Sequence, residues 1–306
     1  MIKRLLLATL LSVSTTVFAA ERIALIWGFS TGSNQANFYR AMVADLNRNQ
    51  NKYEFVFENK PGAGGAIAAK YVLEHSKNTL LGGTSTFFIR PNFDKETGYA
   101  AESFQPVLVQ TLGAPVAFFS SKYNSINSLK KNQDITTSIS GYGSHSNLMG
   151  SILGEHYTGV RIINYLNLID ATKDVQGRHI DTGWNWLSDI EGMIATNPTN
   201  MPVLSVLGIT GTRNIKGFPT LASQGINGFE NTSTNTAIFA SAEMPIEKIQ
   251  ELYELLRVAN KSKDVQAGYA REYSASADFT WAQTVAWFNQ QIKFWREQAL
   301  KVKPLQ

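Results

Sequence analysis

Residues 58–69 read ENKPGAGGAIAA, a stretch in which a strand pattern stops at a proline and restarts, through glycines, as a helix. The alternating apolar residues at 53–57 predict the strand, and residues 67–73 continue as the helix. A glycine loop at a helix start leaves backbone N–H groups unpaired at the positive end of the helix dipole. Such a loop either holds an anion or lets the strand and the helix pack closely.

The same order of strand, polar loop and helix recurs along the chain. It is predicted for strands at 22–27, 80–82 and 135–139, each followed by a loop rich in glycine and hydroxyl residues. Further elements are predicted at 160–165, 171–176, 180–184 and 203–207. Because strands that alternate with helices are joined by right-handed crossovers, these repeats predict an α/β fold with parallel strands.

The length of the chain predicts two domains. With 306 residues, 43% of them hydrophobic, it can bury two cores of ordinary size. A β-prone run at 106–119, interrupted by Gly113 and Pro115, predicts a crossing between domains near Val116, and a return is expected near Ile238. We expect one discontinuous lobe at 20–116 plus 238–306 and a second lobe at 117–237, each a mainly parallel sheet flanked by helices.

Two helices are expected to complete the first lobe. One begins after Pro245, and the other begins at a capping box formed by Thr280 and Gln283. A chain that leaves one lobe, builds another and returns places a cleft between them, at the carboxyl ends of the strands.

The N-terminus predicts export. Residues 1–19 combine Lys3 and Arg4 with an apolar run and a small-residue cleavage site, which is the pattern of a secretory signal. The sequence contains no cysteine, so lipid attachment at cysteine, disulfides, thiol chemistry and iron–sulfur sites are excluded. A formal charge of +4 without a basic stripe gives no indication of nucleic-acid binding. We expect a protein of the periplasm.

The loops, taken in order, resemble those of the periplasmic solute receptors of tripartite tricarboxylate transporters, the Bug or TctC-like family. The most specific match is ENKPGAGG at 58–65, close to the family's N-R/K-P-G-A-G-G signature. Other matches are FSTG at 29–32, GTS at 83–85 with IRP at 89–91, GSHSNL at 143–148, Tyr165 with GRHID at 177–181, and FPTL at 218–221. The resemblance spans nearly the whole chain after the predicted signal.

This resemblance implies a type II-like Venus-flytrap receptor that closes on a small carboxylate and delivers it to a membrane permease. In the family a carboxylate is gripped between the first and fourth loops by backbone amides, hydroxyls and ordered waters. The ligand is a di- or tricarboxylate, an amino-acid-like acid or an aromatic acid, and neither a cofactor nor a metal is expected; we expect a monomer. The candidate ligand-binding residues are Phe29, Gly32, Ser33, Asn34, Gln35, Thr84, Ser85, Ser144, His145, Ser146, Asn147, Tyr165, Asp181 and Trp184.

Several positions depart from the family pattern, so the identity of the ligand does not carry over. Ser33 replaces the second glycine of the first loop, Ala36 an aspartate, Arg90 an asparagine and Asn147 a histidine. Arg90 either points into the cleft, where it would pair with a second carboxylate, or lies on the surface.

One acidic and two aromatic positions keep alternatives open. Asp181, expected at a strand end facing the cleft, either binds an amine or hydroxyl of the ligand or orients a loop. Trp184 and Trp186 alternate along the same strand, so one of them is expected to wall the pocket, although core packing is the commoner role of tryptophan.

Other functions compete with the receptor interpretation. Residues 62–66 partly match a dinucleotide-binding fingerprint, but Pro61, export and the lack of an acidic residue near position 80 oppose that function. Ser144, His145 and Asp181 form the catalytic set of an alternative periplasmic enzyme, although adjacent residues in a turn normally point apart. The four histidines show no metal-ligand spacing. A receptor that signals to a sensor protein, instead of feeding a transporter, is the third alternative. Of these functions, we expect a receptor rather than an enzyme.

Overall fold

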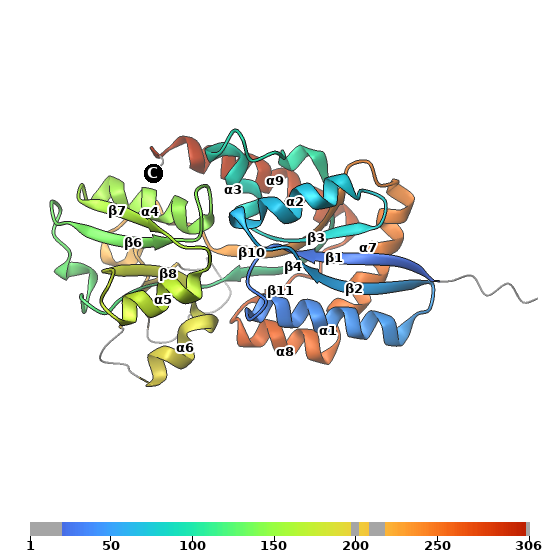
Figure 1. Ribbon diagram of the computed structural model, residues 1–306, viewed down its shortest axis with the longest axis horizontal. Helices are drawn as coiled ribbons and strands as arrows, with labels where there is room; N and C mark the ends of the chain where they lie inside the picture. Colours follow the sequence, from blue (N-terminus) through green and yellow to red (C-terminus); the bar gives the residue numbers. More distant parts are fainter. Residues whose placement is uncertain (1–19, 197–201, 208–217, 304–306) are drawn as a thin grey trace, which may run out of the picture.

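Two β-sheets, one in each lobe, organise the chain (Figure 1). The computed structural model describes residues 20–196, 202–207 and 218–303; the predicted signal at 1–19 lies outside them. The first sheet has six strands in the order β11-β4-β10-β3-β1-β2, and the second has five in the order β7-β6-β8-β5-β9. The predicted two-lobed α/β fold is confirmed.

The first lobe is built on the six-stranded sheet. Its strands are β1 (Glu21–Trp27), β2 (Tyr53–Asn59), β3 (Thr79–Thr84), β4 (Phe104–Ala114), β10 (Thr234–Ser241) and β11 (Ala275–Ser276). Its helices are α1 (Asn34–Asn49), α2 (Ala66–Glu74), α3 (Thr86–Phe93), α7 (Ile246–Asn260), α8 (Lys263–Arg271) and α9 (Trp281–Leu300).

The second lobe is built on the five-stranded sheet. Its strands are β5 (Val116–Ser120), β6 (Ile135–Ile139), β7 (Val160–Asn164), β8 (Thr182–Trp186) and β9 (Val203–Val206). Its helices are α4 (His145–His156), α5 (Leu168–Gln176) and α6 (Leu187–Thr196). Short 3-10 turns occur at η1 (Ala63–Gly65), η2 (Ala101–Ser103), η3 (Ile126–Ser128) and η4 (Ala222–Gln224).

Both sheets are mixed rather than mainly parallel. The pairs β1–β2, β1–β3, β6–β7 and β6–β8 are parallel, as the strand–helix repeats predict. The remaining pairs all involve β4, β5, or the strands next to them, and they are antiparallel. The physical reason is that β5 and β10 enter their sheets from the other lobe, and β4 leaves its sheet for it, so these strands are not joined by helical crossovers within one sheet.

The chain passes between the sheets with little intervening backbone. Pro115 alone separates β4 of the first sheet from β5 of the second. On the return, β10 begins at Thr234, so Ile238, where the sequence places the return, lies inside a strand of the first sheet. The two lobes are therefore joined by extended strand connections (Figure 1).

Helices cover both faces of the first sheet (Figure 1). Ile23 and Leu25 of β1 pack in one core with residues of α1, α7 and α8, whereas Ala24 and Ile26 pack with α2, α3 and α9 on the other face. Side chains alternate along a strand, so a strand buried on both faces is apolar at nearly every position. No helix in the described part of the chain is long and apolar enough to cross a membrane.

The predicted capping box of the last helix is confirmed. Thr280 Oγ1 accepts from the Gln283 backbone N–H at 3.3 Å, and Gln283 Oε1 accepts from the Thr280 N–H at 2.8 Å. Two backbone donors of the first turn of α9 are satisfied in this way. Phe88 of α3 packs edge-to-face against Trp287 of α9, with ring centroids 5.7 Å apart.

Replacing Thr280 with alanine is expected to lower the free energy of unfolding by about 1 kcal/mol, because the cap of α9 loses its acceptor. Urea denaturation followed by circular dichroism measures the change. Thr280→Ser keeps the hydroxyl and serves as the control. Equal stability of the two variants would contradict a capping role.

Candidate functional site

A cavity of about 450 Å³ lies between the lobes, where the carboxyl ends of strands from both sheets meet. From the first lobe it is lined by residues that end or follow strands: Trp27, Phe29, Asn59, Gly64, Thr84 and Thr86. From the second lobe the corresponding residues are Ser140, His145, Ser146, Asn167, Trp186 and Asp189. This is the place where open α/β sheets bind ligands.

Helix N-termini give the cavity its electrostatic character. The first turns of α1, α3, α4 and α5 all contribute lining residues, and a helix N-terminus carries positive partial charge on its free N–H groups. Hydroxyl and amide side chains add donors and acceptors. No lysine or arginine occurs among the described lining residues. The arrangement suits an anionic group that is bound by dipoles rather than by an ion pair.

The glycines of the 58–69 stretch allow two loops to approach closely at this cavity. Gly62, Gly64 and Gly65 all have positive φ, with 58° at Gly64. A Cβ on Gly64 would lie 3.0 Å from Arg90 Nη1, and one on Gly141 of the other lobe would lie 3.6 Å from Gly64 N. The glycines serve close packing here, and Gly62 and Gly64 also line the cavity.

Hydrogen bonds join the lobes around the cavity. The His145 N–H donates to Thr86 Oγ1 at 3.1 Å, and Asn34 donates to Asp189 Oδ1 from both its backbone N and its Nδ2, each at 3.4 Å. The two lobes are therefore in contact on both sides of the cavity.

Arg90 contributes another contact between the lobes and lies outside the cavity lining. Its side chain is buried, with 8% of the residue exposed, so neither of the two alternatives for Arg90 holds: it is not on the surface and it does not line the cavity. The guanidinium donates to Tyr142 O at 2.5 Å, to Asp94 Oδ2 at 2.8 Å and to Thr97 Oγ1 at 3.1 Å. The segment carrying Arg90 is helix α3, which the sequence did not predict, and the helix directs the side chain toward the second lobe.

Half of the fourteen candidate residues line the cavity. These are Phe29, Ser33, Gln35, Thr84, His145, Ser146 and Trp184. Ser33 also caps α1, because its Oγ accepts from the Ala36 N–H at 3.3 Å. Gln35 Nε2 and Trp184 Nε1 are buried donors without a hydrogen-bond partner in the described protein.

Five other candidates support the loops around the cavity or stand beside them. Ser144 caps α4, accepting from the Asn147 N–H at 3.1 Å, and Asn147 Oδ1 accepts from the Gly143 N–H at 2.9 Å. Ser85 Oγ accepts from the Asn235 N–H at 3.2 Å. Asn34 contacts Asp189 as described, and Gly32 is exposed.

Tyr165 and Asp181 lie apart from the cavity lining. The Tyr165 hydroxyl donates to Asp174 Oδ2 at 2.7 Å. Asp181 directly precedes β8, so it sits at the amino end of that strand, whereas the cavity is at the carboxyl end. The expectation that Asp181 faces the cleft is therefore wrong, because it assigned the residue to the opposite end of the strand.

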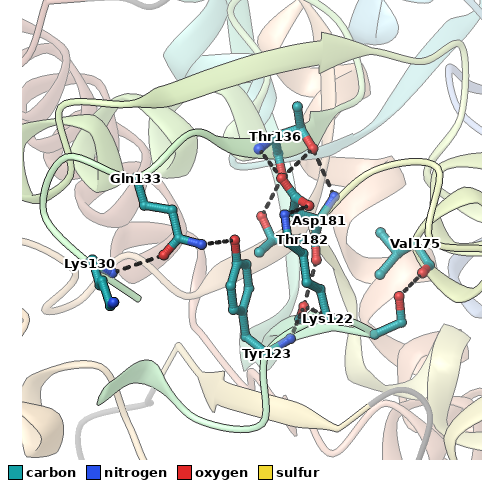
Figure 2. Close-up of polar contacts among 10 residues, drawn as sticks. Lys122, Tyr123, Lys130, Gln133, Thr136, Val175, Asp181 and Thr182 are labelled. Atoms are coloured by element: carbon teal, nitrogen blue, oxygen red, sulfur yellow. Dashed lines mark hydrogen bonds and ion pairs between the residues drawn. The ribbon is translucent and has the colours of Figure 1, made fainter. Parts of the chain in front are cut away.

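Asp181 anchors a polar network inside the second lobe (Figure 2). It pairs with Lys122 Nζ at 2.6 Å and accepts from the Thr136 N–H at 2.9 Å and from Thr136 Oγ1 at 3.0 Å. Burial by itself raises the pKa of Asp181, but the hydrogen bonds from Lys122 and Thr136 outweigh burial and hold the pKa below its ordinary value. The network ties β6 to the start of β8.

His145 is held as a neutral ring. Burial lowers the pKa of His145 to about 4, although the hydrogen bond to Thr232 opposes the shift. Its Nε2 lies 2.5 Å from Thr232 O, and because a carbonyl oxygen can only accept, the proton is on Nε2. His145 and its neighbour Ser146 both line the cavity, and neither carries a charge there.

The alternative catalytic set is not assembled. Ser144 Oγ is engaged with Asn147 N and with Ser146 Oγ, while the His145 ring faces Thr232. Asp181 is engaged with Lys122 and Thr136 at the far end of β8. Among the described residues no cluster of three or more histidines and carboxylates could hold a metal ion.

No protein-family model matches the sequence, and no curated protein matches it. Several solved structures do match the chain in fold. The fold is that of a two-lobed periplasmic binding protein. The periplasmic binding protein BugD is 20% identical, with 93% of this chain and 98% of that chain covered and a TM-score of 0.79. MatC from Rhodopseudomonas palustris with bound malate is 16% identical, with 92% and 100% covered and a TM-score of 0.76. A further R. palustris protein, solved with adipate, is 18% identical, with 93% and 99% covered and a TM-score of 0.79.

The structure adds lining residues that the sequence interpretation missed. Asn167 caps α5 directly after β7, with its Oδ1 accepting from the Asp170 N–H at 2.9 Å. The strand–loop–helix pattern was sufficient to find it. The expectation that only one of Trp184 and Trp186 walls the pocket is wrong. Both line the cavity, because residues two apart along a strand lie on the same face. No sequence pattern indicated Asp189 as a lining residue, because helix α6 was not predicted.

Replacing Asp181 with asparagine is expected to lower the free energy of unfolding by about 2 kcal/mol at pH 7, since hydrogen bonds to a charged group are lost. Because the folded pKa is below the unfolded one, this stabilisation is fully present above the unfolded pKa near 4 and disappears as the pH falls through the folded pKa. Urea titrations at pH 7 and pH 3 measure it. A stability gap between variant and wild type that persists undiminished at pH 3 would refute this account.

Proposed function

We propose that this chain is a solute-binding receptor of the Bug or TctC-like family that acts in the periplasm. It captures a small carboxylate between its lobes and delivers it to a permease of the tripartite tricarboxylate type. The observation that carries the proposal is the cavity, which is formed by helix N-termini of both lobes and has no lysine or arginine among its described lining residues. The predicted secretory signal and the ordered loop motifs support the location and the family.

The proposed mechanism is closure on the ligand. A carboxylate that accepts hydrogen bonds from loops of both lobes stabilises the closed arrangement more than the open one, so it shifts the equilibrium toward closure. Ser146 from the second lobe and Thr84 or Thr86 from the first lobe are the proposed donors. BugD, MatC with malate and the R. palustris protein with adipate share this fold, and the bound acids in two of them fit the same chemistry.

Native mass spectrometry of the protein as purified, followed by a thermal-shift screen of mono-, di- and tricarboxylates and amino and aromatic acids, tests the proposal. A ligand at a hundredfold excess over its Kd adds about 2.7 kcal/mol, which corresponds to a rise of several degrees in Tm. A rise confined to one class of acid is expected. If no acid raises the Tm and none is carried through purification, the carboxylate receptor is refuted.

Replacing Ser146 with alanine is expected to weaken binding of the responding acid by about tenfold or more, the effect of one lost hydrogen bond to a charged group. Ser146 Oγ also accepts from the Ser140 N–H at 2.9 Å, so thermal unfolding of the variant is recorded alongside calorimetry. Ser128→Ala, at an exposed position of the same lobe, is the matched control. Unchanged affinity in a folded Ser146→Ala variant would remove Ser146 from the site.

Capture of permease subunits by the loaded protein in membrane extracts distinguishes delivery from signalling. We expect the partner to be a transporter component. Recovery of a sensor protein instead would support the third alternative.

A further inference from the structure

The cavity contains an acid that an anionic ligand does not explain. Asp189 of α6 is the one carboxylate among the described lining residues, and these residues include no lysine or arginine. The remaining titratable group of the lining, His145, is neutral because burial lowers its pKa to about 4. The described wall of the cavity therefore contributes negative charge and no compensating cation.

The surroundings of Asp189 leave its charge poorly satisfied. The carboxylate accepts from Asn34 N and Asn34 Nδ2, both at the long distance of 3.4 Å, and forms no ion pair with any described residue. Burial raises the pKa of Asp189 to about 6, although the hydrogen bond from Asn34 acts in the opposite direction. Such a shift is what burial without a neighbouring cation produces.

A second acid lies within electrostatic range of Asp189. Glu272, at the end of α8, is buried with 1% of the residue exposed, and neither of its carboxylate oxygens has a hydrogen-bond partner in the described protein. Burial, with a further contribution from Asp189, raises the pKa of Glu272 well above its ordinary value. Asp189 and Glu272 therefore interact electrostatically, and neither forms an ion pair with a described residue.

Aromatic rings in the cavity lining can also attract a cationic nitrogen. Trp27, Phe29 and Trp186 all line the cavity, and the rings of Trp27 and Phe29 are 5.0 Å apart at a tilt of 55°. Aromatic faces attract ammonium groups through their quadrupoles, and a carboxylate beside them supplies the countercharge. The helix N-termini lie at the same cavity and attract a carboxylate instead.

We propose that the ligand carries a protonated or quaternary amine in addition to its carboxylate, and that Asp189 is the residue that selects this amine. This inference rests on the proposed receptor function and narrows its ligand class. A dicarboxylate would leave Asp189 facing a second negative group, whereas an amino acid or a betaine-like acid neutralises it.

Matched pairs of probes test the proposal by calorimetry on the full mature chain. In each pair the second acid keeps the carboxylate chain and lacks the charged nitrogen: 4-aminobutanoate with pentanoate, 4-trimethylammoniobutanoate with 5,5-dimethylhexanoate, and L-glutamate with glutarate. In at least one pair the amine is expected to bind about tenfold or more tightly than its partner, through a charge-assisted hydrogen bond for a primary amine or a desolvated cation–π contact for a quaternary one. The pair that responds also shows whether the amine is primary or quaternary.

The variant Asp189→Asn is expected to abolish that preference by weakening binding of the amine and leaving binding of its nitrogen-free partner unchanged or tighter. Asp189→Ser is the second variant, and thermal unfolding verifies that each is folded. Asp264→Asn, at an exposed carboxylate of α8, is the matched control and is expected to keep the wild-type preference.

The outcomes separate the two proposals. If the acids without nitrogen bind as tightly as the amines, or if the preference survives in both folded Asp189 variants, the inference is overturned while the carboxylate receptor stands. If no member of any pair binds, and the wider screen of acids gives no thermal shift, the receptor function and the inference both fail.

Discussion

The first backbone N–H groups of a helix have no acceptor within that helix, and this protein brings four such helix starts to one cavity. Side-chain caps provide acceptors for some of these N–H groups. Ser33, Ser144 and Asn167 each accept a hydrogen bond from a first-turn N–H, of α1, α4 and α5 respectively. The positive partial charge of these helix starts is directed at the cavity between the lobes. A parallel strand–helix repeat produces this geometry automatically, because each strand ends where the next helix begins.

The contacts that close the lobes are polar and individually modest. Thr86 with His145, Arg90 with Tyr142 and Asn34 with Asp189 are hydrogen bonds, each worth about 0.5–1.5 kcal/mol net, or more where a charge takes part. Under the proposed receptor function, contacts of this size would let a ligand that binds the closed state better shift the equilibrium between open and closed states. Gly64 also matters to the contact between the lobes, because a Cβ there would lie 3.0 Å from Arg90 Nη1 and crowd the guanidinium.

The positive and negative charge around the cavity come from different sources. The positive component comes from dipoles, whereas the formal charge of the described lining comes from one carboxylate, Asp189. Asp181, the acid that the family resemblance indicated, is structural instead, because it joins β6 to β8 through Thr136 and pairs with Lys122 (Figure 2). Two aspartates eight residues apart thus differ in role because one sits at the amino end of β8 and the other in the helix that follows that strand.

Local pattern was enough to predict the strand–loop–helix units, the capping box of α9 and the loops that surround the cavity, since caps, glycines and apolar periodicity are properties of neighbouring residues. The sequence also indicated seven candidates that line the cavity, from Phe29 to Trp184. The antiparallel strand pairs were not predicted, because pairing of β4 with β10 and of β5 with β8 joins segments that are far apart in the chain. Tertiary structure likewise decided that Arg90 bridges the lobes, that Asp181 meets Lys122, and that Asp189 enters the cavity. Each of these outcomes depends on which distant partner a charge meets and on which end of a strand it occupies, and neither is encoded in the spacing of nearby residues.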